Sequence, residues 1–326
     1  MKKLFITAVW LVGSFQLLLA GTDPAAQQSL ATALQRARLF HDQALPLRLD
    51  VDFVAHINVP AKGHLTLIWE EKNHWWRRVV IGDFDQVEIR NGDKFYTSRN
   101  IGFTPTRVYE LIGLLQFAER SEGLLVRKQR KRAENGVEMN CLHVEAENAR
   151  GKSHEVCLNS ASHEILSDDW QETPDEQRRA QYTDYFDFEG QRYPHKLELV
   201  VNGSKVITAN VASLTTAAFD PSLLLPPKGA IERRHCADMK HAFPIKQPDP
   251  LYPKSAKENS LAGDTTVAMT VLTDGSVTDI QLVGSAGRSM DDATLQTLKT
   301  WRFKPATCGA EPVVSDIMVV VRFRLR

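Results

Sequence analysis

The sequence lacks every familiar catalytic signature. Its 326 residues contain no G-x-S-x-G, H-E-x-x-H or C-x-x-C pattern and no phosphate-binding glycine loop, and its 10 histidines show no metal-ligand spacing. Neighbouring carboxylates occur at Asp83 with Asp85 and at Asp168 with Asp169, but such pairs at turns usually face water. We therefore predict a protein that is not an enzyme, with no catalytic residue, no metal site and no cofactor.

Net charge is also lacking, because 40 lysine and arginine residues balance 40 aspartate and glutamate residues. Nucleic acids and anionic membranes attract proteins that carry a basic field, so neither is an expected partner. One basic run, Arg127 to Arg132, precedes the Asn135-Gly136 turn. We interpret this run as a face in contact with water.

Apolar runs long enough to cross a bilayer are missing as well. The clearest run, Leu4 to Ala20, has 17 residues, whereas a spanning helix needs about 20. Lys2 and Lys3 precede it and small residues follow, which is typical of a signal peptide cleaved after Ala20. We predict export to the periplasm by this segment, residues 1–20. The alternative is an uncleaved inner-membrane anchor with the remaining chain facing the periplasm.

Cysteine is scarce, but the 4 residues make an even number. In an exported chain this predicts two disulfides. Cys141 and Cys157 flank an expected hairpin whose turn lies within 147–152, so they face each other and are predicted to bond. Cys236 and Cys308 then form the second disulfide.

Two histidines near the first cysteine pair raise the alternative of a zinc site. If Cys141 faces Cys157, the register of the hairpin places His143 and His154 on opposite faces. Side chains on two faces of a hairpin do not converge on one ion. The register therefore favours a disulfide over zinc.

Alternating apolar and polar residues dominate residues 21–227. The clearest strand, Leu47 to Val59, runs extended over about 13 residues with one apolar and one wet side. An amphipathic helix is predicted before it, from Pro24 to Phe40, and a second helix starts at Thr104-Pro105. Turns at Lys62-Gly63 and Asn91-Gly92 separate further strands. This pattern predicts one domain, a curved antiparallel sheet with helices.

Residues 228–247 are predicted to be a connector, and residues 248–326 a second, smaller domain. Three prolines within 248–253 give the second domain an extended lead-in. Two strands joined by Asp274-Gly275 follow, then a helix capped by Ser289, then a final strand from Ile317 to Arg326. The order is strand, strand, helix, strand (ββαβ), so the whole chain is expected to have an α+β fold.

This ordered set of residues in 248–326 resembles the C-terminal domain of TonB-family energy transducers. The matching residues are Pro250, Tyr252, Pro253, Gly263, Asp274, Gly275, Met290, Asp291, Ala293, Trp301, Arg302, Phe303, Pro305, Ala306, Gly309, Pro312 and Val313. The resemblance implies a domain that contacts an extended segment of an envelope partner, such as an outer-membrane transporter. Classical transducers have a long proline-rich rod, whereas the 20 connector residues reach at most about 70 Å. This difference argues against force transmission across the envelope.

The long sheet with an early and a mid-chain helix resembles the LolA/LolB group of outer-membrane lipoprotein carriers and sensors. The supporting residues are the strand from Leu47, the strands around Trp69, Trp75 and Trp76, the hairpin 91–96, and the terminal Phe219-Asp220-Pro221. The resemblance implies an incomplete barrel whose helices close an apolar cavity. We predict that the long first strand lines this cavity with Val51, Phe53 and Ile57.

Two functions follow from these patterns. The first is a TonB-like adaptor whose final strand is a sheet edge that accepts a partner's strand, with Val320, Arg322, Arg324 and Arg326 as predicted partner-binding residues. An alternative role for the arginines is to prevent edge-to-edge aggregation. The second function is a periplasmic carrier or sensor that holds a lipid or lipoprotein in the cavity.

Overall fold

The computed structural model describes residues 23–325, except 42, 57–58, 101–102, 122, 147–152, 174, 235 and 237. The predicted signal peptide, Ile57 and Arg326 therefore lie outside the described residues. Among the helices of the described ranges, none is long and apolar enough to cross a membrane.

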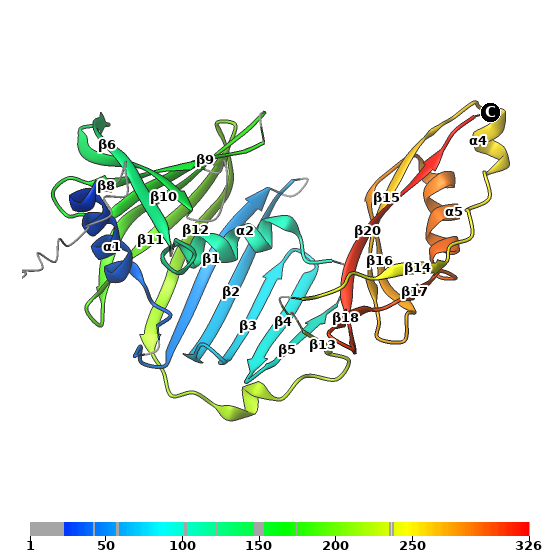
Figure 1. Cartoon of the computed structure of the whole chain (residues 1–326), viewed down its shortest axis with the longest axis horizontal. Helices are drawn as coiled ribbons and strands as arrows, with labels where there is room; N and C mark the ends of the chain where they lie inside the picture. The colour runs from blue at the N-terminus through cyan, green and yellow to red at the C-terminus, as the bar shows by residue number, and fades with distance from the viewer. Residues whose placement is uncertain are drawn as a thin grey trace, which may run out of the picture.

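A single curved sheet of 13 strands forms the larger part of the molecule, the sheet domain (Figure 1). Its first meander contains β1 (Leu47–His56), β2 (Pro60–Glu71), β3 (His74–Ile81), β4 (Phe84–Asn91) and β5 (Lys94–Arg99). Its second contains β6 (Leu124–Glu134), β7 (Val137–Ala146), β8 (Ser153–Asn159), β9 (Ile165–Thr173), β10 (Glu176–Phe188), β11 (Gln191–Val201) and β12 (Ser204–Thr216). The pairing of β12 with β1 joins the two meanders into one antiparallel sheet.

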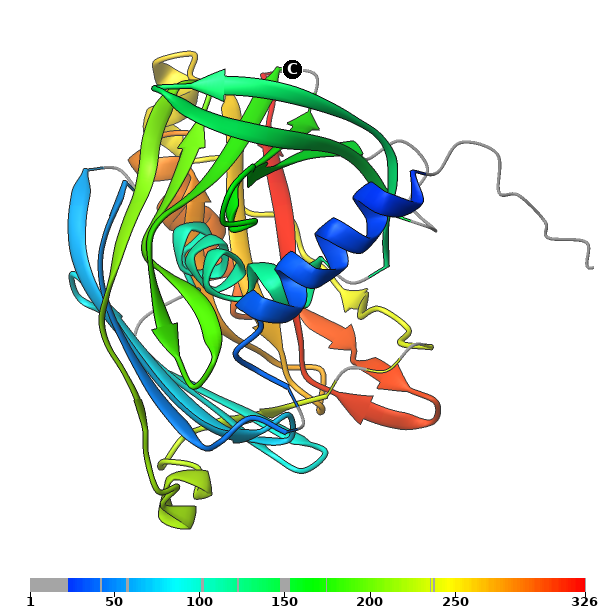
Figure 2. The same cartoon turned by 90° about the vertical axis from the view of Figure 1, so that its left-hand side faces the viewer.

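Three helices lie within the curve of this sheet (Figure 2). They are α1 (Pro24–Ala37), α2 (Thr106–Leu115) and α3 (Phe117–Arg120). Their apolar sides, with Leu30 on α1 and Leu111 on α2, are buried in one core with the inner face of the sheet. The sheet stays open, because its edge strands β6 and β13 stand at opposite ends of the strand order. An incomplete barrel closed by helices is the result.

The first strand is shorter than predicted. It ends at His56, and Lys62-Gly63, expected to be a turn, lies inside β2. Gly63 pairs with Phe53 across the sheet, and a Cβ on Gly63 would lie 2.3 Å from the Phe53 ring. The glycine therefore makes room for an aromatic ring and does not reverse the chain.

The predicted connector is built into the fold. β13 (Ile231–Arg233) pairs with β5 and becomes an edge strand of the large sheet. β14 (Phe243–Lys246) pairs with β17 (Arg302–Lys304) in the C-terminal part, and the 3-10 turn η1 (Pro221–Leu224) precedes both. The two halves of the connector thus belong to different units of the molecule.

The C-terminal unit, from β14 onward, contains an antiparallel sheet with the order β16-β15-β20. Its remaining elements are α4 (Lys254–Glu258), β15 (Gly263–Val271), β16 (Val277–Gly284), α5 (Arg288–Leu298), β18 (Ala306–Cys308), β19 (Glu311–Val313) and β20 (Ser315–Phe323). Val267, Met269 and Val271 pack against Trp301 and Phe303 in its core. The predicted order of strand, strand, helix, strand omitted the short strands β17, β18 and β19.

Candidate functional site

The last strand, β20, is an edge of the C-terminal sheet. It pairs with β15 from Ser315 to Phe323, and in the described part of the chain no strand pairs with its other side. Met318 and Val320 project from it with 64% and 49% of their surface exposed. The predicted edge is therefore present, and partner binding along it stays a prediction.

Two of the three arginines predicted to face a partner, Arg322 and Arg324, are engaged within the chain. Arg324 Nη2 lies 2.7 Å from Asp264 Oδ1, and Arg322 Nε lies 3.9 Å from Asp264 Oδ2. Both arginine side chains remain more than half exposed. Because two arginines share one aspartate, this end of β20 keeps a positive charge that is smaller than the sequence implied.

Several residues of the predicted family motif hold the lead-in against the core and the end of β20. The Tyr252 ring meets the Phe323 ring edge-on, with centroids 5.4 Å apart, and its hydroxyl donates to the Leu261 carbonyl. Trp301 Nε1 donates to the Pro248 carbonyl at 3.0 Å. Half-buried in the same unit are Pro250, Pro253 and Pro305. These residues build the domain that presents the edge strand.

The Asp274-Gly275 turn packs on the backbone of β17. Asp274 Oδ1 accepts the backbone N–H of Ser276 at 2.8 Å, and the Gly275 carbonyl accepts the Phe303 N–H at 2.9 Å. Gly275 has a φ of 79°, and a Cβ there would lie 1.9 Å from the Phe303 carbonyl oxygen. Two parts of the motif that are distant in sequence therefore meet at one backbone contact.

The start of α5 differs from the prediction. The helix begins at Arg288 after Gly287, with no side-chain cap, so Ser289 is not its N-cap. Asp291, 5% exposed, reaches back over the first turn instead. Its Oδ1 accepts the Ala286 N–H at 3.0 Å, which ties the loop before the helix to the helix itself.

The ionised Asp291 carboxylate is stabilised by folding. Burial raises its pKa, but hydrogen bonds from Ser285, Ala286 and Thr265 outweigh burial and lower the pKa below its ordinary value. Because the pKa is lower in the folded state, this stabilisation is present above the ordinary pKa and is lost as pH falls through the folded value.

We expect the stability of the C-terminal unit to decline below about pH 4 and Asp291→Asn to flatten that decline. Urea denaturation followed by tryptophan fluorescence, from about pH 3 to about pH 7, measures both effects. Asp292→Asn, at the exposed neighbouring position, is the control. Parallel pH profiles for the parent and Asp291→Asn would contradict this account.

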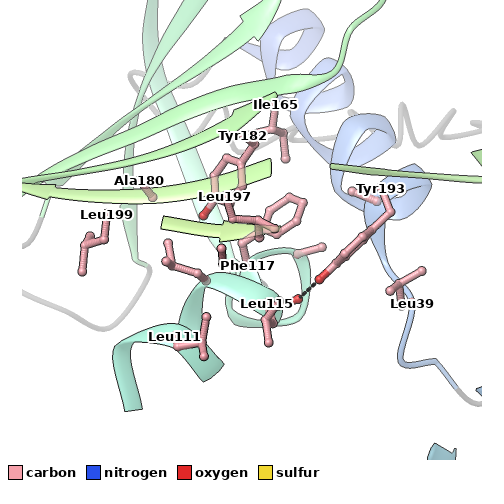
Figure 3. Packing of buried hydrophobic residues seen from close by; sticks show 14 of the residues in the cluster. Leu39, Leu111, Leu115, Phe117, Ile165, Ala180, Tyr182, Tyr193, Leu197 and Leu199 are labelled. Carbon is pink, nitrogen blue, oxygen red and sulfur yellow. Dashed lines mark hydrogen bonds between the residues drawn. The ribbon is translucent and has the colours of Figure 1, made fainter. Parts of the chain in front are cut away.

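A second candidate site is a cavity of about 550 Å³ between α2–α3 and strands β8 to β11. Its inner wall is apolar, with Leu114 and Phe117 from the helices and Ala180, Tyr182 and Leu199 from the sheet. The Phe117 and Tyr182 rings stack with centroids 4.3 Å apart (Figure 3). Its size is within the range of small-molecule sites.

Charged and aromatic side chains line the rest of this cavity. His154, Trp170 and Arg178 lie opposite one another on β8, β9 and β10, and the His154 and Trp170 rings stack with centroids 5.7 Å apart. Arg178 Nη1 lies 2.9 Å from Glu110 Oε1 on α2, and His154 Nδ1 lies 3.0 Å from Asp168 Oδ1. An apolar interior with a charged row fits an amphiphile better than a fully apolar ligand.

The residues predicted to line the cavity lie elsewhere. Val51 and Phe53 are in the packed core, 0% and 3% exposed, and are not among the residues that line this cavity. Their side of β1 is solid core because Gly63 lets the Phe53 ring lie against the neighbouring strand. The third predicted residue, Ile57, is outside the described residues.

Strands β9 and β10 carry the cavity residues that sequence analysis missed. Asp168 and Asp169 were expected at a turn, but both lie in β9 and face opposite sides. Asp168 lines the cavity, whereas Asp169 Oδ1 lies 2.5 Å from Arg179 Nε. In the sequence, this face is marked by cavity-lining residues at every second position, at 168, 170 and 172 in β9 and at 178, 180 and 182 in β10.

Both predicted disulfides are present. Cys141 bonds to Cys157 and Cys236 to Cys308, with Cα atoms 3.9 and 5.8 Å apart. Cys141 is opposite Cys157 in the pairing of β7 with β8, and His143 is opposite Glu155, as the predicted register required.

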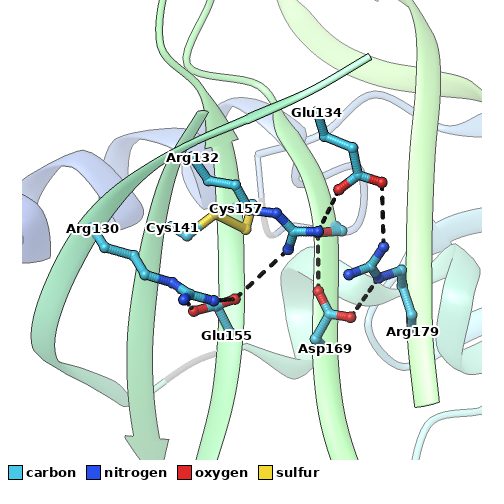
Figure 4. The surroundings of a disulfide bond; sticks show 9 residues. Arg130, Arg132, Glu134, Cys141, Glu155, Cys157, Asp169 and Arg179 are labelled. Atoms are coloured by element: carbon cyan, nitrogen blue, oxygen red, sulfur yellow. Dashed lines mark hydrogen bonds and ion pairs between the residues drawn. A yellow bond between two sulfur atoms is a disulfide. The ribbon is translucent and has the colours of Figure 1, made fainter. Parts of the chain in front are cut away.

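An ionic network lies over the first disulfide (Figure 4). Arg130 and Arg132, from the basic run, lie 2.6 and 3.9 Å from Glu155 Oε2, and Arg132 also lies 2.5 Å from Glu134. These two arginines are therefore neutralised on β6, an edge of the large sheet, and do not form a free basic patch.

The C-terminal unit matches a known family. The sequence profile described as Gram-negative bacterial TonB protein C-terminal matches residues 248–325. The TonB proteins of Pseudomonas aeruginosa and Vibrio cholerae are each 29% identical to this chain, over 83 and 87 residues. These matches cover 25% and 26% of this chain but only 24% and 36% of those proteins. The TonB resemblance predicted for this stretch is confirmed, and it covers a minor part of this chain and of each of the two relatives.

Solved structures also align with the N-terminal part. A LolA superfamily protein from Nitrosomonas europaea has a TM-score of 0.42 and 11% identity, covering 61% of this chain and 97% of that chain. A DUF1329 family protein from Desulfovibrio piger has a TM-score of 0.44 and 9% identity, covering 63% and 98%.

Proposed function

We propose that this protein is an exported, non-enzymatic binding protein of the bacterial envelope that holds an extended segment of a protein partner along β20. The free edge of β20 carries this proposal. Its backbone donors and acceptors on that side are available for an added strand, and the TonB-type domain supports an envelope partner such as an outer-membrane transporter. The disulfides suit the oxidising periplasm, to which residues 1–20 would direct the chain.

The side chains along β20 indicate what a partner segment would contain. Met318 and Val320 are exposed at alternate positions, so they would contact apolar side chains at alternate positions of the added strand. Arg322 and Arg324 follow and share Asp264, which favours an acidic residue beyond the apolar ones. We infer a segment that is apolar in its middle and acidic at one end.

Proline substitutions test strand addition directly. Adjacent residues of a strand present their N–H groups to opposite sides. Of the variants Val319→Pro and Val320→Pro, one therefore removes an N–H donor that faces β15, and the other removes an N–H donor that faces outward. The variant that keeps the β15 pairing should stay folded yet bind its partner about tenfold more weakly or worse. Photo-crosslinking at position 318 in intact envelopes identifies the partner, and its crosslinked peptide serves in the binding measurement.

The arginines form a separate arm of that test. Arg322→Gln with Arg324→Gln should weaken binding of an acidic segment while leaving the backbone contacts in place. A folded proline variant that binds the peptide as tightly as the parent would rule out strand addition. Unchanged binding by the glutamine variant would assign the arginines to preventing aggregation.

The cavity favours a second candidate function, a carrier or sensor for a lipid or lipoprotein. Gly113 lines the cavity from the last turn of α2, so Gly113→Phe places a ring in the free volume without breaking the helix. We expect this variant to bind a lysophospholipid at least about tenfold more weakly, a difference of about 1.4 kcal/mol. Native mass spectrometry and a fluorescent-lipid titration both measure it.

The matched control for the cavity test is Gln28→Phe, which adds the same ring to the exposed side of α1. It should bind the lysophospholipid as the parent does. If the parent binds no lipid, or if the two variants behave alike, the cavity is not a lipid site and the adaptor function stands alone.

A further inference from the structure

Two buried arginines of the sheet domain meet two aspartates of the C-terminal unit. Arg99 on β5 has its Nη2 3.1 Å from Asp279 Oδ2 on β16 and its Nη1 4.0 Å from Asp316 Oδ2 on β20. Arg233 on β13 has its Nη1 2.9 Å from Asp316 Oδ1. The arginine side chains are only 5% and 9% exposed. We call these four residues the arginine cluster.

The surroundings of the arginine cluster orient its groups. Arg233 Nε donates to the Thr97 hydroxyl at 2.7 Å, and the Thr270 hydroxyl donates to Asp316 Oδ1 at 2.7 Å. Asp279 has a φ of 50°, in the left-handed region that costs a residue other than glycine, and lies where the β15–β16 pairing shifts register. The irregularity in the pairing at Asp279 directs its carboxylate toward Arg99.

Buried arginines need these partners. While the units stay in contact, an arginine that loses its carboxylate is left charged, largely buried and unpaired, so the contact favours the orientation in which both arginines meet both aspartates. This argument does not extend to exposed ion pairs, whose charges stay in contact with water. Arg234 pairs with Glu311 across the same two units, but both side chains are more than half exposed and such a pair contributes little.

The second disulfide restricts the same interface. Cys236 follows the end of β13 by three residues and bonds to Cys308 in the C-terminal unit. A tether of three residues reaches about 10 Å. Without the disulfide, the next backbone pairing with the C-terminal unit after β13, among the described residues, is the bridge from Lys240 to Thr307, and a tether from Arg233 to Lys240 reaches about 25 Å.

We propose that the arginine cluster and the Cys236–Cys308 disulfide together form a two-part clamp that holds the C-terminal unit in one orientation on the sheet domain. The cluster sets the orientation, and the disulfide limits separation when the cluster opens. Asp316 lies at the start of β20, so anything bound along that strand stands at a fixed position relative to the sheet domain (Figure 1). The chain then acts as one body and not as two domains on a linker.

Four forms of the full chain test the clamp by small-angle X-ray scattering. They are the parent, Arg99→Gln with Arg233→Gln, Cys236→Ser with Cys308→Ser, and all four changes combined. The clamp predicts parent-like dimensions for the cysteine variant, an increase of no more than about 10 Å for the arginine variant, and up to about 25 Å for the combined variant. Among the four forms, the combined variant should show the largest increase in amide hydrogen exchange along β5.

Arg234→Gln is the matched control, because it removes an arginine that bridges the same units at the surface, and it should leave the scattering unchanged. Circular dichroism confirms that each form is folded. If the combined variant fails to fold, Asp279→Asn with Asp316→Asn in the cysteine variant breaks the same ion pairs by removing their negative charges. A folded combined variant as compact as the parent overturns the clamp, as does full extension in either two-residue variant alone.

Discussion

Gly275→Ala is expected to destabilise the C-terminal unit by roughly 3 kcal/mol or more. A left-handed residue other than glycine costs about 1–2 kcal/mol by itself. The added methyl group would also stand 1.9 Å from the Phe303 carbonyl oxygen, which is backbone and cannot rotate away. Relieving that contact separates the turn from β17 and breaks the Phe303 N–H to Gly275 hydrogen bond. Urea denaturation followed by tryptophan fluorescence measures the loss.

Gly309→Ala provides the comparison that separates the two causes. Gly309 also has a left-handed φ, of 61°, but among the described residues, its two chain neighbours aside, none has a heavy atom within 4 Å of the position of its Cβ. We expect it to cost only the backbone term, about 1–2 kcal/mol. Equal losses for the two variants would mean that the contact with Phe303 contributes nothing, and the link between the two parts of the family motif would be wrong.

Tyr193→Ala is expected to destabilise the sheet domain by about 3–5 kcal/mol. Tyr193 is 1% exposed, and the centroid of its ring lies 6.1 Å from that of Phe117 (Figure 3). The Phe186 ring meets it edge-on, with centroids 6.4 Å apart. Its hydroxyl donates to the Leu115 carbonyl at 2.7 Å, where α2 ends. The residue therefore joins the sheet to the helices that wall the cavity, and thermal unfolding of the full chain reports its loss.

Two further variants divide that effect. Tyr193→Phe keeps the ring and removes the hydrogen bond, so it should cost about 1–2 kcal/mol. Tyr109→Ala removes a tyrosine that is 54% exposed and should stay within about 0.5 kcal/mol of the parent. If Tyr193→Ala costs no more than Tyr109→Ala, the helices are not anchored at this position.

Local signals predicted the parts of the fold that depend on neighbours in sequence. Asn91-Gly92 and Asp274-Gly275 joined the hairpins that the structure shows, because a turn needs only the conformations of its own residues. The register of the first disulfide followed from the same logic. The pairings of β1 with β12 and of β5 with β13 join segments that are distant along the chain, and no local pattern encodes them.

The cavity was hard to predict for a different reason. A strand that faces a solid core shows an apolar residue at every second position, but β9 presents Asp168, Trp170 and Glu172 to the cavity. That polar face makes the strand resemble a loop, so its carboxylates were taken for turn residues. The prediction of the helix N-cap was wrong for a similar reason. Ser289 matches a capping pattern in the sequence, but in the structure Asp291 holds the loop before the helix by accepting the Ala286 N–H.

The strand β13 also determines where this protein can be divided. It covers the backbone of β5, which would otherwise end the large sheet as a row of unpaired donors and acceptors. A fragment that stops at residue 227 would leave that row open to pairing with a second fragment, and so to aggregation. A fragment that continues through Arg233 would keep the edge covered but would carry a buried arginine away from Asp316. Either cut therefore disrupts a contact of β13. A cut at residue 227 uncovers the backbone of β5, and a cut after Arg233 leaves that arginine without Asp316.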